Sequence, residues 1–175
     1  CDTTYAFTEG TKMSIDEILN SIVNYKTRYV CITGGEPLVQ PHLHDLTNIL
    51  LDKNYIITIE TSGLVDISRL NKNISITMDI KTPSSNESKN NIFDNINYLK
   101  KNDVIKFVIA NDDDYTWSKK IIEKYSLTKI CSIYFSPSFN DYSIKTLAEK
   151  IINDQLEVTL QNQFHKQIWG EIRGK

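Results

Sequence analysis

The length, composition and charge of the chain are those of one small globular domain. Of its 175 residues, 40% are hydrophobic and 24% are charged, values typical of a folded protein rather than a disordered one. The 20 Lys and Arg against 22 Asp and Glu give a net charge of −2, which argues against a nucleic-acid partner bound through phosphate neutralisation. No apolar run approaches the roughly 20 residues of a membrane span. We therefore expect a single domain over residues 1–175, with no nucleic-acid or membrane partner and no secretory leader.

The cysteine content indicates a reducing compartment. The three cysteines, Cys1, Cys31 and Cys131, are odd in number and widely spaced, so they cannot form a closed disulfide framework. We therefore expect a cytoplasmic protein. Cys31 and Cys131 lie in strand-like apolar segments, and we interpret both as buried small residues.

Helical and strand-like segments alternate along the chain. The first is an amphipathic helix over 15–23, for which Ser14 and Glu17 form a capping box. There follow, in order, a strand over 30–33, a helix over 43–50, strands over 56–60 and 74–80, a helix over 92–99, a strand over 104–109, a helix over 117–125, a strand over 130–135 and a helix over 144–151. This alternation predicts right-handed βαβ units and a parallel sheet covered on both faces.

Three further features bear on organisation. The order begins with a helix that has no strand before it, and the chain opens directly on Cys1, so we expect a first strand and other residues upstream. The polar stretch 84–91 is predicted to be one exposed loop. The acidic run 112–114 is predicted to be a solvated turn at a helix N-terminus, where the dipole favours carboxylates, rather than a metal site.

The residues that follow the predicted strands are unusually polar. In parallel α/β folds, ligands bind at the carboxyl ends of the strands. One such exit is the run from Thr33 to Pro37, where a Gly pair lets a ligand approach the backbone and Glu36 suits a ligand ammonium; the simpler alternative is a turn with a surface acid. The other polar exits are residues 60–63, 79–85 and 136–138.

Several segments together resemble a known family. Residues 1–6, 32–38, 60–63, 79–81 and 163–166, with Trp169-Gly170, resemble in order and spacing the 7-carboxy-7-deazaguanine synthases of the radical S-adenosylmethionine (SAM) superfamily. Gly-Gly-Glu is shared across the superfamily, whereas the Cys-Asp-Thr-x-Tyr opening and the Gln-Phe-His-Lys run narrow the resemblance to this family. It spans essentially the whole chain. The implied fold is α/β, a partial (β/α) barrel of the radical SAM type with a parallel sheet, whose first strand and cluster loop are missing from this chain.

The resemblance implies two inorganic cofactors. Cys1 matches the last of three cysteines that hold a [4Fe–4S] cluster, whose fourth iron is chelated by SAM, and thiolates suit that site. Thr3 matches a threonine whose hydroxyl joins a Mg²⁺ that also touches the substrate carboxylate. The two earlier cysteines have no counterpart here. Either the chain is a fragment, or it begins where an N-terminal loop becomes ordered, or the protein has lost the cluster.

The resemblance also assigns ligand contacts. Those to SAM fall on Gly34, Gly35 and Glu36 for the methionyl ammonium, Thr61 and Ser62 for the methionyl carboxylate or ribose, Asp79 for ribose hydroxyls, Lys81 for the carboxylate and Ser136 for the adenosine. A plain salt bridge between Asp79 and Lys81 is the alternative for that pair. Thr33 and His165 match contacts to the pterin substrate, whereas His42 and His44 are interpreted as surface residues.

The implied reaction converts 6-carboxy-5,6,7,8-tetrahydropterin to 7-carboxy-7-deazaguanine with loss of ammonia, in queuosine and deazapurine biosynthesis. A 5′-deoxyadenosyl radical derived from SAM takes a hydrogen atom from the substrate, and the protein orients the reactants, so no general acid or base is assigned. The implied partners are the carboxypterin, an electron donor such as flavodoxin or ferredoxin, and a second copy in a homodimer. Two alternatives are another small radical SAM enzyme, such as a glycyl-radical activase, and a non-catalytic α/β binding module.

Overall fold

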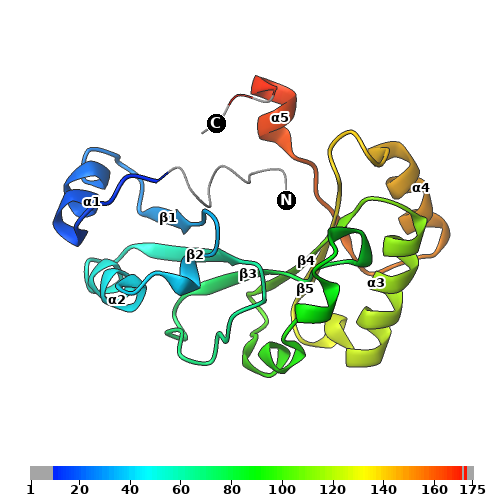
Figure 1. Ribbon diagram of the computed structural model, residues 1–175, viewed down its shortest axis with the longest axis horizontal. Helices are drawn as coiled ribbons and strands as arrows, with labels where there is room; N and C mark the ends of the chain where they lie inside the picture. The colour runs from blue at the N-terminus through cyan, green and yellow to red at the C-terminus, as the bar shows by residue number, and fades with distance from the viewer. Residues whose placement is uncertain (1–9, 171, 173–175) are drawn as a thin grey trace. The chain divides into compact units, whose positions relative to one another are not determined.

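A computed structural model describes residues 10–170 and 172 (Figure 1). Its α-helices are α1 (Ile15–Ile22), α2 (Leu43–Asp52), α3 (Asp112–Tyr125), α4 (Ile144–Asn153) and α5 (Phe164–Trp169). Its strands are β1 (Tyr29–Ile32), β2 (Ile56–Thr61), β3 (Ser75–Asp79), β4 (Val104–Ile109), β5 (Ser132–Pro137) and β6 (Thr159–Leu160). Short 3₁₀ segments are Pro37–Val39, Pro83–Ser85, Ser88–Asn90, Phe93–Tyr98 and Leu127–Lys129.

The strands follow one another in the sheet in chain order, β1-β2-β3-β4-β5-β6. The pairs β1–β2, β4–β5 and β5–β6 are parallel, with registers that begin at Tyr29↔Ile56, Val104↔Ser132 and Tyr134↔Thr159. The expected α/β fold is confirmed. Parallel neighbours end at the same edge of a sheet, so the residues after β1 and β2 share one edge, and those after β4 and β5 share one as well.

The first of two compact units includes the described residues 10–77 and 92–98. Within it, α2 lies beside β2 (Figure 1). Its core contains the fully buried Ile57 and Ile59 of β2 with Leu43 and Leu50 of α2 and with Ile74. The expected start of α1 is confirmed: the side chain of Ser14 accepts a hydrogen bond from the Glu17 backbone, and Glu17 reciprocates at the Ser14 backbone.

The second unit includes the described residues 78–91, 99–170 and 172. Within it, α3 packs beside β4 and α4 beside β5 (Figure 1). Its core includes three packed aromatic rings: Phe107 and Phe135 meet edge to face with ring centroids 5.7 Å apart, and Tyr115 meets Phe135 at 5.8 Å. Such perpendicular contacts are the favoured arrangement of aromatic quadrupoles. No helix in the described residues is both long and apolar enough to span a membrane.

The segment expected as a helix over 92–99 is instead the 3₁₀ segment Phe93–Tyr98. The physical reason is Asn95, which is buried inside it. Its side chain accepts from the Ile67 backbone and donates to the carbonyls of Gly63 and Val65. The segment therefore hydrogen-bonds the backbone of the loop after β2 through Asn95. It does not form a regular helix with an apolar stripe.

Two expectations about single residues are wrong. Cys31 is exposed, not buried, because it lies on the face of β1 that carries the exposed Tyr29, whereas Val30 and Ile32 face the core. Asp114 is fully buried, not solvated: its carboxylate accepts from the backbone N–H groups of Ser84 and Ala110, each at 3.0 Å. The expectation for Cys131 is confirmed, and burial raises the pKa of its thiol to about 11.

Candidate functional site

Glu36 connects the exits of β1 and β2. It caps the 3₁₀ turn Pro37–Val39, and one carboxylate oxygen accepts from the Leu38 backbone N–H at 3.0 Å. The hydroxyl of Thr61, the last residue of β2, lies 3.0 Å from each carboxylate oxygen. Ser62 donates to the other oxygen through both its backbone N–H, at 2.8 Å, and its hydroxyl, at 2.5 Å. Three residues predicted to bind SAM are thus brought together.

These hydrogen bonds limit what the Glu36 carboxylate can do. A carboxylate offers about four lone-pair sites. Here both oxygens accept fixed backbone donors and hydroxyls from Thr61 and Ser62, so the carboxylate's main contacts lie within the chain. Its negative charge remains available to attract a cation through space, but its oxygens hold the two strand exits in place.

The backbone before Glu36 is open to an approaching ligand. Thr33 and Gly34 are exposed, and among the described residues no atom lies within 4 Å of the position that a Cβ of Gly34 would take. The φ angle of Gly34 is +138°, a conformation that residues with a side chain rarely adopt. This backbone conformation therefore favours Gly at position 34, and within residues 10–170 no side chain covers the backbone there.

Asp79 and Lys81 form the second predicted group, at the end of β3. The Lys81 Nζ lies 2.8 Å from Oδ2 of Asp79, and the two side chains are 23% and 17% exposed. The intervening Ile80 is buried, as alternation along an extended segment requires. The other Asp79 oxygen, Oδ1, is buried and has no hydrogen-bond partner in the described part of the chain.

That unpartnered oxygen is the feature that a plain salt bridge does not explain. Leaving a buried acceptor unsatisfied costs free energy, typically about 1–3 kcal/mol. A ligand hydroxyl or N–H that donates to Oδ1 removes this cost. The expected salt bridge between Asp79 and Lys81 is present, and Asp79 also presents an acceptor suited to a ligand.

Comparisons with known proteins decide the family. Residues 1–125 match the model of the radical SAM superfamily. The 7-carboxy-7-deazaguanine synthase of Chlorobaculum tepidum is 37% identical over 99% of this chain and 81% of that protein. The chain belongs to the 7-carboxy-7-deazaguanine synthase family. The synthase of Clostridium acetobutylicum is 40% identical over 97% of this chain and 80% of that protein.

A solved structure has a fold similar to that of this chain. The crystal structure of QueE from Escherichia coli has a TM-score of 0.66 and 22% identity to this chain. The match covers 85% of this chain and 64% of that one, so this chain spans less than two thirds of the Escherichia coli protein. The fold expected from the sequence, an α/β structure of the radical SAM type, is confirmed.

The remaining residues predicted for a family member have varied surroundings. Ser136 is buried on β5, whereas His165 is exposed on α5. His42 and His44 are exposed, as expected, and His42 lies 3.3 Å from Asp45 at the start of α2. Cys1 and Thr3, predicted to bind the cluster and Mg²⁺, lie outside the described residues. Within the described ranges, no three His, Cys, Asp or Glu side chains are placed to hold a metal ion.

The structure adds two residues, Gln163 and Asn91, to the candidates for a functional role; the sequence motifs assigned no role to either. Gln163, at the N-cap of α5, has a buried side-chain oxygen without a partner in the described residues. Gln163 belongs to the C-terminal motif over residues 163–166, so this motif could have indicated a role for it. Asn91 bonds both backbone groups of Lys81 and carries no motif signal, because only the folded loop brings the two residues together.

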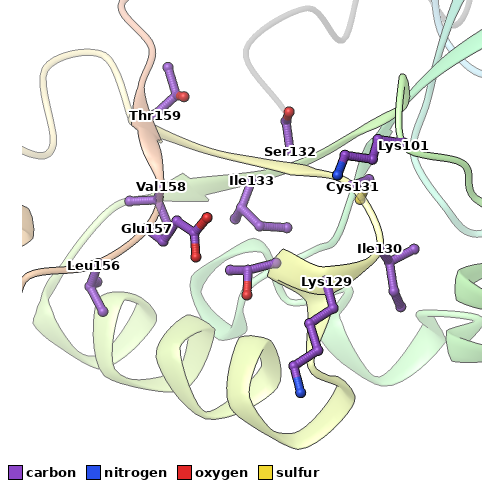
Figure 2. Close-up of a pocket in the computed structure, with 11 residues that line it drawn as sticks. Lys101, Lys129, Ile130, Cys131, Ser132, Ile133, Leu156, Glu157, Val158 and Thr159 are labelled. Atoms are coloured by element: carbon purple, nitrogen blue, oxygen red, sulfur yellow. The ribbon is translucent and has the colours of Figure 1, made fainter.

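A hollow of about 400 Å³ lies elsewhere in the second unit (Figure 2). Its lining comes from Lys101 before β4, from residues 128–133 before and at the start of β5, and from residues 156–159 before and at the start of β6. It lies at the start of β5, whereas Asp79 lies at the end of β3. None of the predicted site residues lines it, so it gives no support to the assignment of the SAM site.

Proposed function

We propose that this protein is a 7-carboxy-7-deazaguanine synthase, which converts 6-carboxy-5,6,7,8-tetrahydropterin to 7-carboxy-7-deazaguanine with loss of ammonia. The observation that carries the proposal is family membership, with 37% identity to a named synthase over 99% of the chain. A match of this extent favours the synthase over a glycyl-radical activase or a non-catalytic module. The implied biosynthetic role, in queuosine and other deazapurines, is part of the same proposal.

The second group of site residues fits SAM chemically. SAM offers ribose hydroxyls that donate hydrogen bonds, and the buried, unpartnered Oδ1 of Asp79 is an acceptor that needs such a donor. SAM also carries a carboxylate, and the Lys81 ammonium is a matching cation whose present partner is Asp79. Ser136, buried on β5, is proposed as an adenosine contact.

The residues at the exits of β1 and β2 form the first group of site residues, and they fit the methionyl end of SAM. The exposed backbone at Gly34 lets a ligand amine approach, together with Gly35, while the charge of Glu36 favours an ammonium through space. The hydrogen bonds from Thr61 and Ser62 fix the Glu36 carboxylate, so these two hydroxyls act first as its supports. This chain's own groups thus bind and orient a ligand, and no proton transfer is assigned to them.

Radical SAM membership implies SAM and a [4Fe–4S] cluster as cofactors. When bound, this cofactor pair supplies the radical chemistry of the reaction. We propose that Cys1 is a cluster ligand, that Thr3 contributes to a Mg²⁺ site that clamps the substrate carboxylate, and that Thr33 and His165 contact the pterin. A one-electron donor such as flavodoxin or ferredoxin, a homodimeric state and a cytoplasmic location are proposed on the same family basis.

Binding of a carboxylated pterin separates this proposal from the other radical SAM activities. The full-length protein, reconstituted without oxygen, should bind 6-carboxytetrahydropterin in calorimetry. His165→Ala should weaken that binding by about tenfold or more, because a polar group of the bound pterin left without its partner typically costs about 1–3 kcal/mol. His44→Ala, on the exposed surface of α2, is the matched control and should bind normally. Failure of the wild-type protein to bind the pterin while it still cleaves SAM would favour a different substrate.

A further inference from the structure

The side chain of Asn91 holds the backbone of Lys81 at two points. The Asn91 side-chain oxygen accepts from the Lys81 N–H at 2.9 Å, and its amide nitrogen donates to the Lys81 carbonyl at 2.8 Å. The same nitrogen donates to the Ser88 carbonyl at 2.9 Å. One partly buried side chain therefore satisfies both backbone groups of Lys81 and ties them to the loop that returns after β3.

The bonds from Asn91 begin where the backbone hydrogen bonds between β3 and β4 end. The Ile80 N–H still donates to the Lys106 carbonyl of β4 at 2.9 Å. At Lys81 the primary amide of Asn91, which has one acceptor and one donor side like a peptide group, takes the place of a neighbouring strand. At Thr82 the hydroxyl returns to β4 by donating to the Val108 carbonyl at 3.0 Å.

The Lys81 ammonium reaches one oxygen of Asp79 and not the other. Lys81 has a long, flexible side chain that can reach either carboxylate oxygen from a mobile backbone. In the structure its Nζ donates to Oδ2, at 2.8 Å, and leaves Oδ1 without a partner. A shift of the Lys81 backbone would let the ammonium approach Oδ1 and cover the acceptor that a ligand needs.

We propose that Asn91 is a positioning residue for the SAM site, which acts by holding Lys81 so that Oδ1 of Asp79 stays available to the ligand. This inference rests on the proposed function, because the ligand is the SAM proposed for Asp79 and Lys81. Asn91 itself does not touch the ligand. It acts only through the backbone of Lys81.

The experiment is a double-mutant cycle in SAM affinity. Calorimetry with SAM on the anaerobically reconstituted full-length protein compares wild type, Asn91→Ala, Lys81→Ala and the double variant. We expect Asn91→Ala to weaken SAM binding by about tenfold, because the ligand then competes with the Lys81 ammonium for Oδ1 of Asp79. In the Lys81→Ala background the same substitution should have no further effect, because its route to the ligand is gone. For Asn91→Ala, the loss should appear mainly in the KM for SAM rather than in kcat.

The neighbouring Asn90 provides a matched control. Among residues 10–170 its side-chain amide donates only to the exposed Glu87 carboxylate, at 2.6 Å, so Asn90→Ala should leave SAM affinity unchanged. Should Asn91→Ala fail to fold, Asn91→Asp keeps the acceptor for the Lys81 N–H, removes the donor, and enters the same cycle with a smaller expected loss. Thermal melting of every variant reports folding.

The outcomes separate the two proposals. If wild type binds SAM and Asn91→Ala binds it equally well, or weakens binding to the same extent with and without Lys81, the positioning role is overturned while the proposed function stands. If the reconstituted wild-type protein does not bind SAM at all, the proposed function and this inference both fail.

Discussion

At the scale of single residues, Glu36 makes contacts within the chain that its sequence motif did not predict. The motif predicted a carboxylate directed at a ligand ammonium, but its oxygens accept hydrogen bonds from Leu38, Thr61 and Ser62. Glu36 comes from one motif, and Thr61 and Ser62 come from the next one along the chain. Their mutual bonding depends on the register of β1 against β2, which places both exits at one edge and which no single motif encodes.

Glu36→Gln tests this role. The amide cannot accept at both ends, and each carboxylate oxygen now faces a backbone donor, the Leu38 N–H at 3.0 Å or the Ser62 N–H at 2.8 Å. Whichever way the amide turns, one N–H opposes its NH₂ group. We expect SAM affinity to fall by about tenfold, with a loss of about 1–3 kcal/mol in the free energy of unfolding.

Calorimetry with SAM and urea unfolding measure the two effects. Glu60→Gln is the control, since Glu60 precedes Thr61 on the same strand and is exposed. Equal SAM affinity and stability in Glu36→Gln and wild type would show that the bonds to the two strand exits contribute nothing.

At the scale of elements, the regular pattern was predictable and the irregular parts were not. Strand and helix periods gave β4 at its observed bounds, Val104–Ile109, and the capping box gave the start of α1. The strand β6 has only two residues, too few to show a period, and the 3₁₀ segment at Phe93–Tyr98 depends on long-range bonds of Asn95. Such tertiary bonds override a local helical pattern.

One contact between elements carries a pH dependence. Asp154, at the end of α4, accepts from Lys119 at 2.5 Å and from the Tyr115 hydroxyl at 2.8 Å, both on α3. These hydrogen bonds lower the pKa of the Asp154 carboxyl, chiefly that from Lys119. A carboxyl with a lowered folded-state pKa adds stability above its unfolded-state pKa, and this stability is lost as the pH falls through the lowered value.

We therefore expect Asp154→Asn to reduce the pH dependence of unfolding. Wild type should lose more stability than the variant as the pH falls below about 4, the ordinary range of an aspartate. Urea unfolding at a series of pH values measures the difference, with Glu157→Gln, an exposed carboxylate, as control. Parallel stability profiles for wild type and Asp154→Asn would contradict the linkage.

At the scale of the whole molecule, the alternation of strands and helices and the family were predictable from sequence. Alternating strands and helices predicted the parallel connections, and motifs that span the chain predicted a family that the relatives confirm. The hydrogen-bond partners of the site residues were harder to predict from sequence. The unpartnered oxygen of Asp79 and the two bonds from Asn91 to Lys81 arise from a loop whose path the polar composition of 84–91 does not specify.

The decisive measurement is product identification. The full-length protein, reconstituted with iron and sulfide without oxygen, is incubated with SAM, a reductant, Mg²⁺ and 6-carboxytetrahydropterin, and the mixture is analysed by mass spectrometry. We predict 7-carboxy-7-deazaguanine together with ammonia in equal amounts, and none when SAM is omitted. Release of 5′-deoxyadenosine without 7-carboxy-7-deazaguanine, or no turnover of the pterin by protein with an intact cluster, would contradict the proposed function.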